Sequence, residues 1–434
     1  MLADDLRIRQ LFEMASRDRA AGRVSEAERI LQQAQAEAPQ HPLVLNEMAS
    51  KRLRAGDPAG ALEIINQSVK RDPANPTSWL HLAAIQRRLG RDNDAMAALD
   101  RVLAIQPRNL YGLLHMASLH QAKGDLRTAA ATYRMALQSI PANAELAPDM
   151  QPLLQNARAV IEANNRDLES FMETRLQALR DRYSGERLER FDKAMDTLLL
   201  KRPVYRPQPS FLYFPHLPAI EFYHRDDFPW LASIEAATDD IRAELFAVMA
   251  EGPVALQPYM ALPGPVADKW RELNNSKRWG AYFLWREGVA FPDHLARCPR
   301  TAAALEAWPP CDLPGCAPTA MFSILEPRTR IPPHVGVNNA RLVVHIPLVI
   351  PPDCGFRVGA ETREWKLGEA FVFDDTIEHE AWNNSDDWRA VLIIDIWNPH
   401  LSQAERDMVS ALTAGVDDFY GVLPTYVKPA QKPD

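Results

Sequence analysis

The sequence predicts a multidomain chain of α and β structure, in which an all-α repeat solenoid is followed by a double-stranded β-helix of the jelly-roll, cupin-like type. Three observations predict this. The first 143 residues repeat with a fixed period, residues 321–397 alternate short β-branched runs with turn residues, and a proline-rich stretch at 203–211 lies between them. With 434 residues the chain exceeds the usual size of one domain, so we expect two or three.

The repeat has a period of 34 residues in four separate registers. Proline and glycine recur at Pro39, Pro73, Pro107, Pro141, Gly22, Gly56, Gly90 and Gly124, and alanine recurs at Ala15, Ala49, Ala83, Ala117, Ala27, Ala61, Ala95 and Ala129. A pair of helices per repeat explains the pattern, because glycine ends the first helix in a left-handed cap and proline stops the second. The pattern resembles tetratricopeptide repeats, which implies four repeats over residues 1–143.

Such an array has a concave face that often holds a peptide or another protein. The alternative is that the array only packs on the rest of the chain or dimerises. Basic residues near the ends of first helices, at Lys51, Arg52, Arg87 and Arg88, suit an acidic ligand, although charge on a helix face is usually just solvated. We expect a protein or peptide partner for this part of the chain.

Residues 144–207 read as a helical connector that ends in the proline-rich linker. Apolar residues recur every three or four positions at Leu168, Phe171, Met172, Leu176 and Leu179, which predicts an amphipathic helix. Residues 208–434 then form the β domain, with a helix at 231–251, a strand at 280–285 and a loop with a short helix at 289–316. Within it, the short apolar runs of residues 321–397 are typical of a compact barrel or sandwich.

Three polar residues stand where such a barrel favours apolar side chains: His334, His379 and Arg389. Each taken singly has a structural interpretation, as a hydrogen-bonded histidine or a solvated arginine. Together they indicate a site, because two neutral imidazoles suit a first-row metal such as iron and a guanidinium fork suits a carboxylate. Strand alternation places Arg341 and His345 on one face, and with His334 at the start of their strand we expect that face to line the interior.

Residues 321–397 resemble the catalytic domain of the aspartyl/asparaginyl β-hydroxylase family of iron(II)- and 2-oxoglutarate-dependent oxygenases. The resemblance is carried by PPHVGVNNARLVVH around His334, by VFDDTIEHEAWN around His379, and by Arg389 ten residues later. It extends upstream to about Tyr213 through FPHLPAIEFYHRDDFPWL and the run from Tyr282 to Trp285. The resemblance covers roughly half of the chain.

The resemblance also implies roles for individual residues. His334 and His379 match the iron ligands, and Asp375 is assigned to a metal-bound water beside them. The remaining matches concern the organic ligands: Arg389 and Ser323 for the far carboxylate of 2-oxoglutarate, His345 and Trp285 for further positions at that pocket, and Arg341 for a substrate carboxylate. The carboxylate of a 2-His-1-carboxylate triad is replaced by Gly336, as is typical of this family, while Val343 stands where its best-known members have a second arginine.

The implied activity is hydroxylation of an aspartyl/asparaginyl-type residue of a protein or peptide, using Fe(II), 2-oxoglutarate and O2, with the repeat array aiding substrate or partner binding. One alternative is a lipid or small-molecule hydroxylase, since the family also resembles lipid A 2-hydroxylases. Another is a non-catalytic repeat scaffold. The retention of His334, His379, Ser323 and Arg389 argues against the scaffold.

Composition narrows the possible partners and location. A net charge of −8 disfavours nucleic-acid binding, and no apolar run reaches the length of a membrane span. Acidic residues near the start and the lack of an apolar core there disfavour a signal peptide, so we expect a cytoplasmic protein. The four cysteines, Cys298, Cys311, Cys316 and Cys354, lack CxxC spacing, which disfavours a zinc site and favours free thiols.

Overall fold

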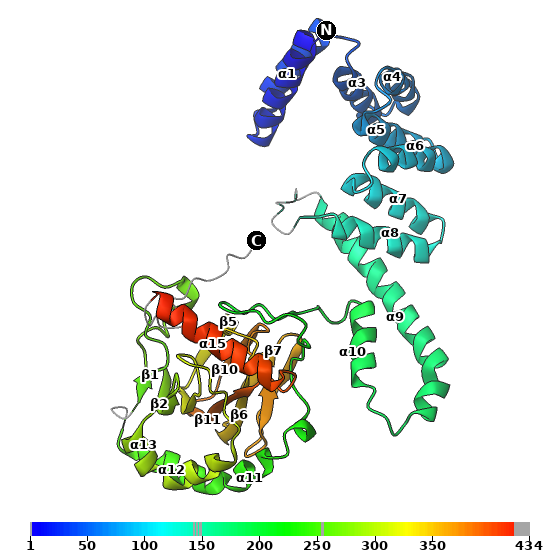
Figure 1. The fold of residues 1–434 in the computed structure, drawn as a ribbon. Helices are drawn as coiled ribbons and strands as arrows, with labels where there is room; N and C mark the ends of the chain where they lie inside the picture. The colour runs from blue at the N-terminus through cyan, green and yellow to red at the C-terminus, as the bar shows by residue number, and fades with distance from the viewer. Residues whose placement is uncertain (1, 142–143, 145, 147–149, 253–255, 421–434) are drawn as a thin grey trace. The chain divides into compact units, whose positions relative to one another are not determined.

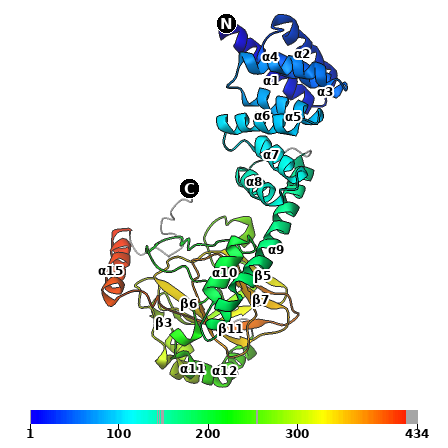
Figure 2. The same ribbon diagram turned by 90° about the vertical axis from the view of Figure 1, so that its right-hand side faces the viewer.

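The computed structural model describes residues 2–141, 144, 146, 150–252 and 256–420. These divide into two compact units, Met1–Met195 and Asp196–Asp434. The first is helical and the second is rich in antiparallel β-sheet (Figures 1 and 2). The end of the predicted repeat array (142–143), the start of the predicted connector (145, 147–149) and the last residues of the predicted β domain (421–434) lie outside the described residues.

The first unit consists of helix pairs in which each helix packs against the next. Its helices are α1 (Leu2–Ala20), α2 (Val24–Glu37), α3 (Pro42–Arg54), α4 (Pro58–Arg71), α5 (Pro76–Arg88), α6 (Asp92–Ile105), α7 (Leu110–Ala122) and α8 (Leu126–Gln138). The repeating glycines have positive φ, from 72° at Gly90 to 81° at Gly56, as the left-handed cap requires. The repeating alanines Ala61 and Ala129 are fully buried between the paired helices. The predicted helical repeat is confirmed.

Helix α9 (Gln151–Arg182) follows the array, and α10 (Glu189–Leu198) comes after it. The first half of α9 covers the last pair, because Leu154 and Ile161 bury their side chains in a cluster with residues of α7 and α8. Of the apolar stripe predicted farther along, Leu168, Met172 and Leu176 are partly buried, whereas Phe171 and Leu179 are exposed, by 60% and 50%. None of the helices in the described parts of the chain is both long enough and apolar enough to cross a membrane.

The second unit holds two antiparallel sheets. Its strands are β1 (Gln257–Pro258), β2 (Trp279–Arg286), β3 (Val289–Ala290), β4 (Ala320–Leu325), β5 (Thr329–His334), β6 (Arg341–Val349), β7 (Cys354–Val358), β8 (Glu361–Arg363), β9 (Phe371–Phe373), β10 (His379–Asn383) and β11 (Arg389–Trp397). The larger sheet has the order β1-β2-β4-β11-β6-β9, with β3 beside β2, and the smaller has the order β5-β10-β7-β8. The double-stranded β-helix predicted from the sequence stays a prediction.

Short helices cover one face of the larger sheet. Helices α11 (Leu231–Ala236) and α12 (Thr238–Ala250) lie together beneath the strands in Figure 1, and Leu231 and Leu245 are fully buried against β6 and β11. Helices α13 (Pro292–Arg297) and α14 (Pro299–Ala304) follow β3, and α15 (Gln403–Tyr420) ends the described chain. The opposite face of this sheet is therefore available to line an internal cavity.

One expectation about strand order is wrong. His334 does not start the strand that carries Arg341 and His345; it ends β5, which pairs with β10 in the smaller sheet. Residues 335–340 separate β5 from β6, so the chain passes from one sheet to the other between them. The two predicted iron ligands, His334 and His379, thus come from the smaller sheet, and Arg341 and His345 come from the larger sheet.

Candidate active site

A cavity of about 470 Å³ lies in the second unit and is lined by both sheets. The larger sheet contributes Met321, Ser323, Arg341, Val343, His345, Arg389, Ile393 and Asp395, and the smaller contributes Ile331, His334, Phe356, His379 and Ala381. Asp375, in the turn before β10, also lines it. Seven of the eight residues that the sequence assigned to the site therefore meet around one cavity, and Trp285 is the exception.

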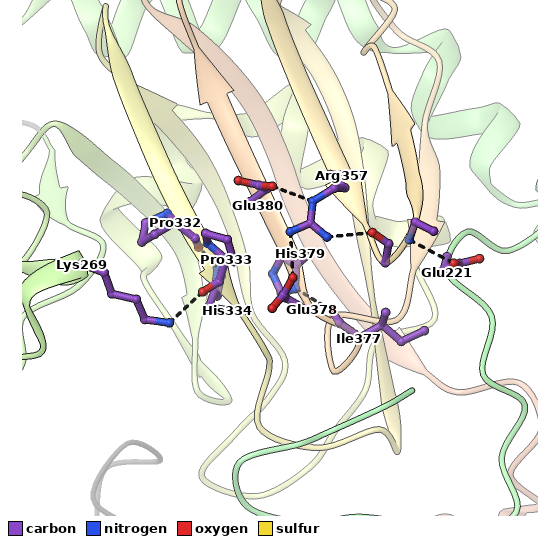
Figure 3. A network of polar contacts seen from close by, with 12 residues as sticks. Glu221, Lys269, Pro332, Pro333, His334, Arg357, Ile377, Glu378, His379 and Glu380 are labelled. Carbon is purple, nitrogen blue, oxygen red and sulfur yellow. Dashed lines mark hydrogen bonds and ion pairs between the residues drawn. The ribbon is translucent and has the colours of Figure 1, made fainter. Parts of the chain in front are cut away.

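His334 and His379 face each other across β5 and β10. They are paired in the register of the two strands, and their ring centroids lie 4.1 Å apart. Nδ1 of His334 lies 2.8 Å from the carbonyl oxygen of Pro332, and Nδ1 of His379 lies 3.1 Å from that of Ile377 (Figure 3). A carbonyl can only accept, so each Nδ1 carries the proton and each Nε2 keeps its lone pair free.

The electrostatic environment keeps both rings neutral. Burial and the neighbouring histidine lower the pKa of His334 to about 3, and burial lowers the pKa of His379 to about 4. A neutral imidazole with a free Nε2, whose Nδ1–H is held by a backbone carbonyl, is the arrangement in which histidine binds metals. The pair therefore fits a first-row divalent metal.

Asp375 stands beside this pair without completing a three-residue cluster. No group of three or more His, Cys, Asp or Glu side chains with metal-binding geometry occurs within the described residues. A Cβ added to Gly336 would lie 2.3 Å from Cγ and Oδ2 of Asp375, so this carboxyl fills the space of a side chain at position 336. A carboxylate side chain at position 336 is sterically excluded, because the carboxyl group of Asp375 already occupies that volume.

Arg389 is buried at the other end of the cavity without a carboxylate partner. Its side chain is 1% exposed, its Nε and Nη1 have no hydrogen-bond partner among the described residues, and its guanidinium lies 4.5 Å from the centre of the Trp365 ring. Burial lowers its pKa to about 10, so it still carries its charge at neutral pH. A buried cation with unsatisfied donors indicates an anionic ligand.

Ser323 and His345 lie near the same end of the cavity. The hydroxyl oxygen of Ser323 accepts a hydrogen bond of 3.2 Å from Nε1 of Trp279, which leaves its proton available for a ligand. His345 sits 4.9 Å from the ring of Phe356 and 4.8 Å from that of Phe373, with no partner on Nδ1. Burial and then the charge of Arg389 lower its pKa well below the usual value.

The structure does not bring Trp285 to the cavity. Pairing between β2 and β4 is irregular between Phe283 and Trp285, where Phe283 pairs with Met321 but Trp285 pairs with Ala320. This bulge inverts the alternation of side chains, so Trp285 packs 5.9 Å from Trp308 on the helix-covered face. Trp279, at the start of β2, lines the cavity by regular alternation with Ala281 and Phe283, but it lies one residue before the strand predicted at 280–285 and was not predicted.

Arg341, expected to hold a substrate carboxylate, already has two internal partners. Its Nη2 lies 3.0 Å from Oδ2 of Asp375 and its Nη1 lies 3.5 Å from Oδ2 of Asp395. Burial acts to lower the pKa of Arg341, but the two carboxylates raise it above the usual value. Asp395 was not predicted, although it shares a strand face with Arg389, six residues away on β11, and that parity was a usable signal.

A polar network on the outer face of the smaller sheet holds the strand that carries His379 (Figure 3). Arg357 of β7 donates from Nε to Glu380 at 2.6 Å and from Nη2 to Glu378 at 2.9 Å, so it contacts both neighbours of His379. Lys269 donates to the carbonyl oxygen of Pro333 at 2.8 Å, next to His334. These contacts fix the backbone on either side of the two imidazoles.

We expect Arg357→Gln to weaken metal binding by roughly tenfold, because residues that orient a metal ligand typically contribute at least that much affinity. Titration with Co(II), followed by its visible absorption, measures the change. Arg363→Gln, which removes a comparable pair with Glu361 on the adjacent β8, is the matched control and should leave affinity unchanged. Equal affinity in Arg357→Gln and the control would show that the network does not position His379.

Residues 235–399 match the family described as Aspartyl/Asparaginyl beta-hydroxylase, and residues 52–119 match Tetratricopeptide repeat. Ornithine lipid ester-linked acyl 2-hydroxylase from Rhizobium tropici is 35% identical over 185 residues, 42% of this chain and 62% of that protein. Aspartyl/asparaginyl beta-hydroxylase from Mus musculus is 33% identical over 164 residues, 37% of this chain and 22% of that protein. The chain thus spans less than two thirds of the length of both relatives.

A third relative matches a longer stretch of this chain. Aspartate beta-hydroxylase domain-containing protein 2 from Homo sapiens is 26% identical over 266 residues, which make up 60% of this chain and 70% of that protein. All eight residues assigned from the resemblance lie within the matched residues 235–399. The chain therefore carries a domain of the aspartyl/asparaginyl β-hydroxylase family together with a region of tetratricopeptide repeats.

Proposed function

We propose that the chain is an iron(II)- and 2-oxoglutarate-dependent dioxygenase that hydroxylates an aspartyl/asparaginyl-type residue of a protein or peptide. The observation that carries this proposal is a single cavity with two neutral imidazoles, each with a free Nε2, and a buried arginine that lacks a carboxylate partner. A metal fits the imidazoles and a small acid fits the arginine. Both proposed ligand sites line the same cavity.

The residues of the chain have separate tasks in this proposal. His334 and His379 would hold the iron, and Asp375, which lines the same cavity, would accept a hydrogen bond from a water molecule bound there. Arg389 and Ser323 would bind and orient the far carboxylate of 2-oxoglutarate, and His345 would line a further part of the same pocket. When bound, iron and 2-oxoglutarate supply the activation of O2 and the oxidising power for C–H hydroxylation.

The cavity walls also limit side reactions. Phe356 and Phe373 are almost fully buried and lie within 6.0 Å and 5.8 Å of the His379 ring, measured between ring centroids. Such walls exclude bulk water from the reacting centre and strengthen the electrostatic interactions within it. In this proposal, the two phenylalanine walls confine the oxidising chemistry to a substrate bound in the cavity.

A second candidate substrate class is an acyl lipid. The similarity to the ornithine lipid hydroxylase of Rhizobium tropici, 35% identical over 185 residues, favours it. The repeat region favours a protein or peptide, because stacked helical repeats form surfaces that bind such partners. The same oxidative chemistry serves both classes.

The test of the proposed function needs no knowledge of the substrate. The purified chain is titrated with Fe(II) and 2-oxoglutarate without oxygen, then exposed to air, and succinate is measured. We expect stoichiometric binding of both and slow succinate formation that depends on both. Failure to bind iron or 2-oxoglutarate, or binding without succinate, would favour a non-catalytic scaffold.

The contribution of the repeats can be tested by truncation. A chain that begins at Pro203 retains all of the proposed metal and 2-oxoglutarate ligands, so we expect it to form succinate without substrate at the rate of the full chain. It should lose most hydroxylation of a protein target, because distant binding energy helps to position the reacting bond. If the repeats are only structural, the truncated chain should aggregate through newly exposed apolar surface. A soluble truncation with full activity on the target would contradict both roles.

A further inference from the structure

The charged residues that line the cavity are unevenly paired along its length. The cations are Arg286, Arg341 and Arg389, and the acids are Glu287, Asp375 and Asp395. Arg286 lies 3.7 Å from Glu287, and Arg341 contacts the other two acids. Arg389 is the one of these three lining cations with no acidic partner in the described parts of the chain.

The two ends of the cavity are defined by β11. Arg389 and Asp395 are six residues apart on the same face of this strand, which separates their Cα atoms by roughly 20 Å at about 3.3 Å per residue. His345 pairs with Ile393, and Val343 pairs with Asp395. The proposed 2-oxoglutarate would therefore occupy the Arg389 end, which leaves the Arg341 end for a substrate.

The Arg341 end has more acceptors than donors. Asp375 and Asp395 are 6% and 1% exposed, and Arg341 is the guanidinium that contacts both. One oxygen of each acid already accepts from Arg341, and Oδ2 of Asp395 also accepts from the Thr319 amide at 3.1 Å. Oδ1 of each acid lacks a hydrogen-bond partner among the described residues. Two buried acceptors and one buried donor, Nε of Arg341, thus lack a hydrogen-bond partner among the described residues at this end, a set that the N–H and C=O groups of an amide can match.

This arrangement discriminates between substrate groups by charge and by hydrogen bonding. A carboxylate would add a negative charge beside two carboxylates that share one guanidinium, and it would bring no donor for either Oδ1. An uncharged amide brings N–H donors to these oxygens and leaves the Arg341 pairs intact. A carboxylate could accept from Nε of Arg341, which has no hydrogen-bond partner among the described residues, but it would leave both Oδ1 atoms without a donor, and Val343 provides no second cation.

We infer that the substrate group entering the Arg341 end is an uncharged amide, recognised by Asp395 and Asp375, rather than a carboxylate. The inference rests on the proposed function and specifies its substrate class. In a protein substrate the reacting residue would be asparaginyl rather than aspartyl. In a lipid substrate the acyl group would carry an amide.

The test measures binding beside the metal, without turnover. The full chain is loaded with Mn(II), whose unpaired electrons speed the relaxation of nearby protons, and with 2-oxoglutarate in the absence of oxygen. Proton relaxation is then compared for N-acetyl-asparagine amide, N-acetyl-aspartate amide and hexanamide at neutral pH. We expect the asparagine probe or hexanamide to be relaxed at least tenfold more strongly than the aspartate probe. Stronger relaxation of N-acetyl-asparagine amide would indicate a peptide substrate, and stronger relaxation of hexanamide would indicate an acyl substrate.

Asp395→Asn supplies the second arm. It removes one negative charge but keeps an acceptor for the Thr319 amide, so we expect the preference for amide over carboxylate to fall by about tenfold. Asp386→Asn, at an exposed acid that pairs with Arg328, is the control and should preserve the preference. Equal relaxation of all probes, a preference for aspartate, or an unchanged preference in Asp395→Asn would overturn the inference. Loss of Mn(II) or 2-oxoglutarate binding in the unmodified chain would instead refute the proposed function.

Discussion

His334→Ala and His379→Ala should each abolish stoichiometric iron binding while leaving the fold intact. The two imidazoles are the metal ligands of the proposed site, and the described residues offer no three-residue cluster to replace a lost one. Their truncation should not unfold the chain, because both side chains lie at strand ends beside an open cavity rather than in the packed core. Anaerobic Fe(II) titration followed by metal analysis measures the loss, and circular dichroism checks the fold.

His294→Ala is the matched control for these two variants. The Nδ1 of His294 also contacts a backbone carbonyl, that of Phe283 at 2.7 Å, but the ring stacks on Tyr282 and does not line the cavity. This variant should bind iron as the unmodified chain does. If His334→Ala or His379→Ala retained one equivalent of iron at unchanged affinity, the assigned metal site would be wrong.

Arg389→Ala should weaken 2-oxoglutarate far more than iron. Removal of a buried, charge-assisted partner from a carboxylate costs on the order of 2 to 5 kcal/mol, which corresponds to roughly a thirtyfold to few-thousandfold loss of affinity. Anaerobic titration of the iron-loaded chain with 2-oxoglutarate measures it. Arg328→Ala, at an arginine that is 64% exposed, should change neither ligand. Unchanged affinity for 2-oxoglutarate in Arg389→Ala would exclude this role.

Arg389 should favour the binding of 2-oxoglutarate but destabilise the ligand-free fold. Without ligand, Arg389 is a buried charge beside the Trp365 ring, and its Nε and Nη1 lack partners among the described residues, so the fold carries part of its desolvation cost. Arg389→Met preserves most of the side-chain volume and removes the charge. We expect it to raise the melting temperature of the ligand-free chain while it loses 2-oxoglutarate, and a lower melting temperature would show that Arg389 is satisfied within the fold.

Local signals in the sequence predicted the elements, whereas long-range pairing decided the details of the candidate site. The glycine and proline spacing predicted the helix pairs because each helix end is set by residues within the same repeat. The alternation around Arg341 and His345 predicted which side chains share a face. The partners of Arg341 could not be predicted, because Asp375 and Asp395 are 34 and 54 residues away in the chain.

Two other details depended on irregular backbone. The bulge in β2 turned Trp285 away from the cavity, and nothing in the aromatic run marks the irregularity. The passage of residues 335–340 from one sheet to the other moved His334 away from the strand of Arg341. Periodicity assumes continuous strands, so it fails where a strand bulges or changes sheet.

The close approach of Asp375 to Gly336 makes these two positions mutationally interdependent. Any side chain at 336 would begin 2.3 Å from the Asp375 carboxyl, so even alanine there requires that acid to move. A chain with this fold can therefore not gain an acid at 336 by a single tolerated substitution while Asp375 stays in place. The order of the two substitutions therefore matters. A shorter side chain at position 375 has to come first, because it opens the volume that a carboxylate at position 336 would need. The two positions are thus epistatic, since the effect of a substitution at 336 depends on the residue at 375.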